Sequence, residues 1–484
     1  MTERELRLEI DEYVTYVLSL GDMESTPGAK VIHDSIHGTS MFLGHEIALI
    51  DLPIIQRLRR ISQTDVASLV FPAANHNRFE HTVGVATIAG SMVESLYKRG
   101  NPLLSNIDKD YTYHNCRAAA ILHDCGHGPF SHSSEYTFKH WLKDIKRTNP
   151  RLAAASAHEI LSFMIATSDP MREYNERVIK GVYGVDIDLD FVGDMIVGYV
   201  DKTKRPDLAF AVAIINGAFD ADKLDYIMRD AYSTGINMPL DLPRLMYTLD
   251  VLKDAEGLTR LAIDSSGVSS LEGIIFNKMM LTATIYQHQK VRCAGCVLRS
   301  VFAKSASLYS PCDFLRITDD DVFSLESDLP EVKEYINILR NRILPKRALC
   351  ISPRTLENPS ALGRIINAFG DEGIREKLTE EICSYASVHL SHELPREFVW
   401  LDCPPHAVFK EASQCIIKSP GEYMPLTEIF PVDDWVRTFS ESKYHGFVYT
   451  MPCHREAAYA SSRAVLEGAF GVKFNDLARR LCKL

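Results

Sequence analysis

Apolar residues recur every three or four positions along most of the chain, which is the period of an amphipathic helix. This pattern extends from Gly44 to about Leu308 and resumes over residues 332–385. It is clearest in residues 85–96, 116–122 and 158–164. We therefore predict a mainly α protein, with a short helical lead that ends at the break Ser25-Thr-Pro-Gly28.

Short runs of β-type residues flank this helical region. Residues 30–38 are typical of a strand and turn that could close a small hairpin. After Leu394-Pro395, the runs 398–401, 415–417 and 446–450 are separated by Pro and Gly, and an amphipathic segment follows from Pro452. We predict an N-terminal lead over residues 1–29, a helical core over 30–330, and a C-terminal helical and α+β lobe over 331–484.

Composition narrows the class of protein. The 484 residues are 46% hydrophobic and 24% charged, as in an ordinary globular protein, and the net charge of -11 argues against a broad nucleic-acid surface. Eleven cysteines follow no disulfide framework, and the start of the chain is charged rather than apolar. No run approaches the roughly 18 apolar residues of a membrane span. We therefore expect a cytoplasmic protein without a membrane segment.

Four residues in three helical segments suit a divalent metal ion. Two imidazoles and two carboxylates can hold a metal that activates water or binds phosphate oxygens. Neighbours in mid-helix point about 100° apart, so an adjacent His and Asp need a helix end to share one site. We expect Cys125-Gly126 to provide that end. The candidate ligands are His81, His123, Asp124 and Asp222.

More histidines follow directly after this set. The run His123-Asp-Cys-Gly-His127-Gly-Pro-Phe-Ser-His132 places three imidazoles within ten residues, and His158 opens a later helix. Imidazole titrates near neutral pH, so it can protonate a leaving alkoxide or hold a phosphate. Glu135 lies three residues after His132, within reach on one helix, and could orient an imidazole. As isolated residues, His132 and His158 would more often be structural.

One helix carries a polar stripe that suits a nucleotide. Asp222, Tyr226 and Asp230 are spaced four apart, and Lys223 stands beside them. A solvated charged face is the alternative interpretation. Arg78 and Lys278 could bind phosphate if the fold brings them to the same place.

Several motifs together resemble the HD-domain deoxynucleoside triphosphate (dNTP) triphosphohydrolases, without the sterile alpha motif that some members carry. The resemblance covers about residues 30–325 well and the closing lobe loosely. It is carried by Asp34-Ser-Ile-His-Gly38, Gln56-Arg-Leu-Arg59, Phe71-Pro-Ala-Ala-Asn-His-Asn-Arg-Phe-Glu-His-Thr-Val-Gly84, His123-Asp-Cys-Gly-His-Gly-Pro-Phe-Ser-His132, Asp222-Lys-Leu-Asp-Tyr226, Tyr286-Gln-His288 and Leu315-Arg-Ile-Thr-Asp319.

This resemblance implies a role for each candidate residue. Water would attack the α-phosphorus of a dNTP, and His132, beside His127 and His158, would protonate the leaving 5′-oxygen. The mixed His and carboxylate ligands allow Fe, Mn, Zn or Mg as the metal, and Mg²⁺ would accompany the nucleotide. The triphosphate would be held by Arg78, Lys223 and Lys278, and the sugar and base by Gln63, Tyr226, Asp230 and Tyr286.

The resemblance also implies regulation and leaves alternatives open. Asp51, Gln56 and Arg59 match an activator site for GTP or a dNTP in a homo-oligomer, either a dimer or a tetramer. An Asp51–Arg59 salt bridge between helices explains the same residues equally well. An HD-type phosphodiesterase or nuclease, and a non-catalytic nucleotide sensor, are the alternative functions. The nature of the product would distinguish all three.

Overall fold

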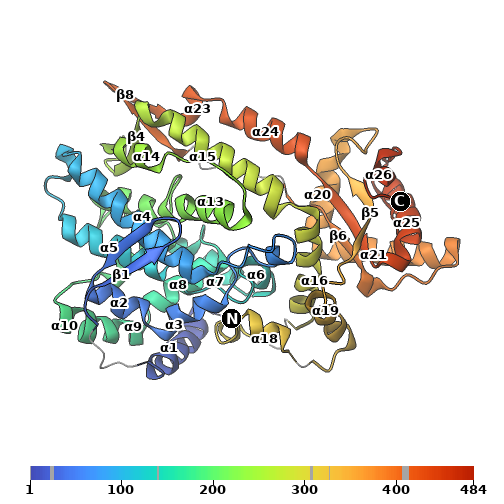
Figure 1. Ribbon diagram of the computed structural model, residues 1–484, viewed down its shortest axis with the longest axis horizontal. Coiled ribbons are helices and arrows are strands. Elements are labelled where there is room, and N and C mark those ends of the chain that lie inside the picture. Colours follow the sequence, from blue (N-terminus) through green and yellow to red (C-terminus); the bar gives the residue numbers. More distant parts are fainter. Residues whose placement is uncertain (1, 22–26, 139–140, 306–308, 326, 406–413) are drawn as a thin grey trace. The chain divides into compact units, whose positions relative to one another are not determined.

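The computed structural model describes residues 2–21, 27–138, 141–305, 309–325, 327–405 and 414–484. The chain forms two compact units, drawn in Figure 1 with colours that follow the sequence. The first contains residues 1–278, 305–324 and 410–432, and the second contains 279–304, 325–409 and 433–484. The predicted boundaries at residues 29 and 330 stay predictions. Within the described ranges, no helix has the length and apolar character needed to cross a membrane.

The first unit is mainly helical, as the periodicity predicts. Its longest helix, α4, packs between α5 and α13, and α11 packs against α5 and α8. The α-helices that lie in it are α1 (Glu3–Ser19), α2 (Gly44–Ile50), α3 (Pro53–Gln56), α4 (Arg78–Lys98), α5 (Lys109–Leu122), α6 (His132–Phe138), α7 (Lys143–Thr148), α8 (Ala157–Ala166), α9 (Asp169–Tyr174), α10 (Gly181–Tyr183), α11 (Leu189–Ile196), α12 (Ala209–Ile215), α13 (Ala221–Thr234), α14 (Leu242–Thr248), α17 (Pro311–Phe314), α18 (Asp319–Phe323) and α23 (Leu426–Ile429).

Two small sheets complete the first unit. The predicted N-terminal hairpin is confirmed: β1 (Lys30–Asp34) pairs antiparallel with β2 (Gly38–Phe42). A second sheet has the order β3-β4-β7-β8, with β3 (Leu249–Lys253), β4 (Thr259–Asp264), β7 (Ile416–Ser419) and β8 (Glu422–Pro425).

This second sheet corrects two predictions. Strands β3 and β4 lie within the region that the periodicity predicts to be mostly helical. The sequence does not reveal β3 as a strand, because its residues are almost all buried and show no alternation. The β7 run was expected to belong to the closing lobe, but it pairs parallel with β4 of the first unit.

The second unit is the confirmed C-terminal α+β part. Its sheet has the order β5-β9-β6, with β5 (Lys346–Ile351), β6 (Val399–Asp402) and β9 (Gly446–Thr450). Buried residues of the sheet pack with α21 and α25 into one core. Strand β5 interrupts a segment of the second unit that was predicted to be helical. In the first unit, the predicted break at residues 25–28 lies partly outside the described residues. Within its described ranges, the second unit also contains seven whole or nearly whole α-helices. Its helices are α16 (Gln289–Ser305), α19 (Pro330–Arg340), α20 (Leu362–Gly370), α21 (Glu372–Leu390), α24 (Val432–Lys443), α25 (Arg455–Phe470) and α26 (Leu477–Arg480), while α15 (Val268–Leu281) runs from the first unit into the second.

Candidate active site

The first turn of α4 carries two of the candidate residues. Asn77 is the N-cap, and its side-chain oxygen accepts a hydrogen bond from the backbone N–H of Glu80 at 3.1 Å. Arg78 is the first helical residue, and His81 follows one turn later on the buried face. The cap therefore fixes the start of the helix and, with it, the position of His81.

His123 and Asp124 come directly after α5, which ends at Leu122. The predicted helix end at Cys125-Gly126 is thus three residues too late. Gly126 does not end the helix but allows the chain to pack closely against α8, since a Cβ there would lie 2.5 Å from the backbone nitrogen of Ser162. Nδ1 of His123 lies 2.7 Å from the carbonyl oxygen of Ala120, so it donates there and directs Nε2 away from the helix.

The imidazoles of His81 and His123 converge on Asp124. One ligand atom from each of the three lies within 4.8 Å of the others. Asp222 joins them from α13, with Oδ1 3.0 Å from Nε2 of His81, although not in hydrogen-bond geometry. Among the described residues, the buried Nε2 atoms of His81 and His123 have no hydrogen-bond partner. Leaving such atoms unsatisfied costs about 1–3 kcal/mol each. This donor set fits a divalent metal ion.

The electrostatics of this group favour a bound cation. Burial opposes ionisation of Asp124, but Arg78, His123 and His127 hold its pKa well below the usual range. Burial also disfavours a charged His81, yet the carboxylates of Asp222 and Asp225 raise the pKa of that imidazole to about 10. The negative charge that would attract a proton to His81 would also attract a metal ion.

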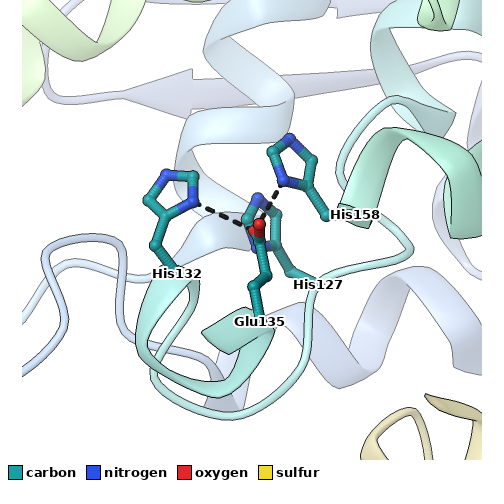
Figure 2. A group of neighbouring side chains, drawn as sticks. All are labelled: His127, His132, Glu135 and His158. Atoms are coloured by element: carbon teal, nitrogen blue, oxygen red, sulfur yellow. Dashed lines mark hydrogen bonds and ion pairs between the residues drawn. The ribbon is translucent and has the colours of Figure 1, made fainter. Parts of the chain in front are cut away.

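The remaining predicted catalytic residues form a second cluster around Glu135 (Figure 2). Oε1 of Glu135 lies 2.6 Å from Nδ1 of His158 and 3.0 Å from Nδ1 of His132. His127 is 3.4 Å from the same oxygen, and its ring stacks on that of His158 with the centroids 3.8 Å apart. Glu135, which was predicted to be able to orient an imidazole, therefore contacts two of them, and its orienting role stays a prediction.

The imidazoles of this cluster differ in charge. Burial lowers the pKa of His158, but Glu135 more than offsets this and raises it to about 9. Burial, together with Arg78 and His158, holds the pKa of His127 well below its ordinary value. His132 is the accessible member, with 69% of its side chain exposed. The cluster thus combines a cationic, a neutral and a solvent-facing imidazole.

The two groups adjoin one another. Nε2 of His127 lies 3.4 Å from Oδ1 of Asp124. A polar pocket of about 50 Å³ also reaches both groups, since His123, Asp124, Asp222 and His158 line it together with Lys223. One site therefore contains a group of side chains that can hold a metal ion and a group that can carry protons.

Three of the seven predicted substrate residues, Lys223, Asp230 and Arg78, bind other residues of the protein, and Lys223 lines this pocket. Nζ of Lys223 is 2.5 Å from Oδ2 of Asp220, the N-cap of α13. Asp230 accepts a hydrogen bond from His76 at 2.7 Å. Arg78 donates to Oδ2 of Asp124 at 2.5 Å and to Oγ of Ser131 at 2.6 Å.

The other predicted substrate residues lie on further elements. The backbone N–H of Gln63 donates to the carbonyl of His76 at 3.1 Å, which places Gln63 beside the start of α4. Tyr226 is on α13 with Asp222 and Asp230. Lys278 ends the first unit's part of α15, and Tyr286 belongs to the second unit. Their roles stay predictions.

The predicted activator residues lie close together in sequence and contact one another in part. Nε of Arg59 donates to Oε1 of Gln56 at 2.8 Å, and the guanidinium lies over the ring of Phe79. Asp51 pairs with Lys30 at 3.1 Å. The alternative of an Asp51–Arg59 salt bridge is therefore wrong for this structure, because each residue binds a different partner.

Sequence reasoning gave no role to a buried network behind His81. Oδ2 of Asp225 lies 2.7 Å from Nδ1 of His81, and the same carboxylate binds His37 and Arg229. Arg229 in turn pairs with Asp34. A signal was present, since Asp225 and Arg229 are spaced four apart on one helix, but its link to His81 joins residues 144 positions apart.

Two family models match the chain. The HD domain model matches residues 78–183, and a model of an HD-associated region matches residues 240–469. The first range contains His81, His123 and Asp124, the three residues that converge in the structure. The chain therefore contains an HD domain followed by an HD-associated region. The helical core and the small sheets agree with this assignment.

Curated relatives of this HD-domain protein include named dNTP hydrolases. The chain is 27% identical over 336 residues to the deoxynucleoside triphosphate triphosphohydrolase SAMHD1 homolog of Dictyostelium discoideum, covering 67% of this chain and 61% of the relative. It is 29% identical over 359 residues to SAMHD1 of Danio rerio, covering 71% and 55%. The uncharacterized protein YwfO of Bacillus subtilis is 31% identical over 255 residues, covering 52% and 50%. The chain thus spans about half to three fifths of the length of these relatives.

A solved structure shares the fold over most of the chain. A hypothetical protein from Aquifex aeolicus superposes with a TM-score of 0.63 and 22% sequence identity, covering 90% of this chain and 99% of that one. The HD-domain protein therefore shares its fold with a protein of nearly matching extent.

Proposed function

We propose that this protein hydrolyses dNTPs to a deoxynucleoside and inorganic triphosphate, by attack of water on the α-phosphorus. The observation that carries the proposal is the meeting of two groups in one site: the His81, His123, Asp124 and Asp222 set, and the three imidazoles around Glu135. The relatives named as dNTP triphosphohydrolases support the same reaction.

The proposed metal ligands are His81, His123, Asp124 and Asp222, since the first three converge and Asp222 adjoins His81. A divalent ion held there, whether Fe, Mn, Zn or Mg, would lower the pKa of a water molecule and neutralise charge on phosphate oxygens. Mg²⁺ would accompany the nucleotide.

The His132 side chain is the proposed general acid. Its Nδ1 donates to Glu135, so the imidazolium form of His132 carries a second proton on Nε2, which it would give to the 5′-oxygen as the bond from that oxygen to phosphorus breaks. Glu135 holds His158 in the same way, and the resulting cation can bind phosphate oxygens. The neutral His127 lies between Asp124 and Glu135 and completes the polar wall of the site.

The cationic residues are assigned to the triphosphate. Lys223 lines the pocket beside Asp222, and Arg78 uses two of its five N–H groups on Asp124 and Ser131, so others are available for phosphate. Lys278 is the third proposed phosphate-binding residue. The sugar and base are assigned to Gln63, Tyr226, Asp230 and Tyr286.

The proposal extends to regulation by nucleotide. Gln56 and Arg59 already contact one another, and Asp51 lies on the preceding helix end, so the three can present a guanine-binding edge to GTP or a dNTP activator. A homo-oligomer, dimer or tetramer, would place this site between copies of the chain.

Product identification tests the proposal. Purified protein is incubated with each of the four dNTPs, singly and mixed, with Mn²⁺ or Mg²⁺, and the products are separated by ion-exchange chromatography. Deoxynucleoside with inorganic triphosphate supports the proposal, and turnover that requires a mixture supports the activator site. Shortened oligonucleotides without dNTP turnover would instead identify a nuclease, and binding without any product would identify a sensor.

A further inference from the structure

Behind the imidazole of His81 lies a fully buried carboxylate with an unusually complete set of partners. Each oxygen of Asp225 accepts two hydrogen bonds. Oδ2 lies 2.7 Å from Nδ1 of His81 and 2.8 Å from Nε of Arg229. Oδ1 lies 2.6 Å from Nε2 of His37 and 2.9 Å from Nη2 of Arg229. His81, Asp225 and Arg229 are each at most 1% exposed.

These bonds decide which nitrogen of His81 faces the metal site. An ionised carboxylate only accepts hydrogen bonds, so Nδ1 of His81 must carry the proton that lies between them. In the neutral imidazole, the lone pair is then on Nε2. That atom faces Asp222 and, at 3.7 Å, Asp124.

We propose that Asp225 is a positioning residue for His81: it fixes the imidazole in the Nδ1-protonated form with Nε2 directed toward the metal site. The inference rests on the metal ligands assigned in the proposed function. Carboxylates that bind the far nitrogen of a ligating histidine typically contribute 10- to 100-fold to metal affinity.

The positioning network continues into the N-terminal hairpin. Nη1 of Arg229 pairs with Oδ2 of Asp34 at 2.9 Å, and Oδ1 of Asp34 accepts from the backbone N–H groups of Ile36 and His37 at 2.8 Å each. The turn between β1 and β2 is therefore anchored to α13, and His37 reaches Asp225 from this turn.

A glycine lets the two helices approach closely enough for this arrangement. Gly84 lies three residues after His81 on α4, and a Cβ at this position would overlap both Asp225 and the guanidinium of Arg229. The absence of a side chain at Gly84 thus leaves room for the Asp225 carboxylate where α4 contacts α13.

Metal affinity tests the inference without relying on activity. Full-length protein is stripped of metal and titrated with Mn²⁺, and free Mn²⁺ is measured by electron paramagnetic resonance. Asp225→Asn places an amide N–H group where an acceptor is needed and should weaken Mn²⁺ binding about 10- to 100-fold. The matched control is Asp194→Asn, which removes another buried carboxylate paired with two arginines, Arg151 and Arg205, and should leave Mn²⁺ affinity unchanged.

The outcomes separate this inference from the proposed function. If wild type binds Mn²⁺ and Asp225→Asn binds it equally well, the positioning role is overturned while the metal site stands. If wild type binds no Mn²⁺ at all, the proposed metal site fails and the inference fails with it.

A second measurement needs no substitution at Asp225. In zinc-loaded wild type, ¹⁵N NMR of the histidine rings, assigned with His81→Ala, should find the His81 proton on Nδ1. A proton on Nε2 would contradict the inference even if Asp225→Asn failed to fold.

Discussion

Glu135 accepts a hydrogen bond from Nδ1 of His158 at 2.6 Å, and the same oxygen lies 3.0 Å from Nδ1 of His132. One carboxylate therefore holds two imidazoles by the same ring nitrogen. Nε2 of His132 is left for a ligand, while Nε2 of His158 lies 3.3 Å from Oγ of Ser156. This arrangement allows the two histidines to have different roles, because His158 is buried beside His127 while His132 is accessible.

The pH dependence of activity should reflect the Glu135–His158 pair. Burial lowers the pKa of His158, but Glu135 raises it to about 9, above its ordinary value. The cation is therefore present below about pH 9 and is lost as the pH rises through that value. Glu135→Gln should move the alkaline limb of the kcat/KM profile to lower pH. An unchanged limb in this variant would contradict the role of Glu135.

His132→Ala should remove the proton donor while leaving the metal site intact. General acid catalysis typically contributes about 10²- to 10⁴-fold, so kcat should fall by that factor. The Mn²⁺ affinity of the site formed by His81, His123 and Asp124 should not change, because His132 belongs to the other group, around Glu135. The matched control is His389→Ala, an exposed histidine in the second unit, which should retain full activity. Full activity in His132→Ala would assign the proton donor elsewhere.

Metal binding should stabilise the folded protein. At a free Mn²⁺ concentration of 100 times the Kd, a site that exists only in the folded state contributes about 2.7 kcal/mol. We expect a higher Tm with Mn²⁺, and its reversal by a chelator, in a thermal unfolding assay. The double variant His123→Ala, Asp124→Ala should lose this increase. If the variant responds to Mn²⁺ as wild type does, the ligands are wrongly assigned.

In the second unit, the stability of the fold should depend on a buried ion pair. Asp402 is 6% exposed and pairs with Arg292 and Arg299. Removing one partner of such a pair typically costs about 3–5 kcal/mol, so Asp402→Asn should unfold at lower urea concentration. Arg292→Lys should cost less, since it keeps the charge.

The same pair gives a pH dependence of stability with a definite sign. Burial alone would raise the pKa of Asp402, but the two arginines hold it below its ordinary value of 3.8. Its contribution is therefore present above about pH 4 and is lost as the pH falls through the folded-state pKa. The difference in urea midpoint between wild type and Asp402→Asn should shrink in acid. A constant difference would contradict this interpretation.

The sequence predicts the candidate site residues better than the buried residues that hydrogen-bond to them. Short segments of the sequence contain residue types that already indicate metal and proton chemistry. The structure brings together the side chains of these segments, which are His81, His123, Asp124, His127, His132, Glu135 and His158. Asp225 and Arg229 look like an ordinary helical ion pair. Their link to His81 and to the hairpin turn depends on helix packing that no local pattern contains.

Strand positions were predicted where the local pattern was distinctive. The hairpin β1–β2 consists of two short strands on either side of a turn at residues 35–37, and the local sequence already indicated a strand followed by a turn. The buried run β3 resembles a buried helix segment. The sheet that β7 joins could not be predicted, because the pairing of Ile417 with Ile263 spans two distant parts of the chain.

The most direct test of the proposed reaction is hydrolysis of a dNTP in H₂¹⁸O, with mass spectrometry of both products. Attack of water on the α-phosphorus predicts one ¹⁸O atom in the inorganic triphosphate and none in the deoxynucleoside, and no products with the His123→Ala, Asp124→Ala variant. Label in the deoxynucleoside, or release of a nucleoside monophosphate with pyrophosphate, would contradict the proposed reaction.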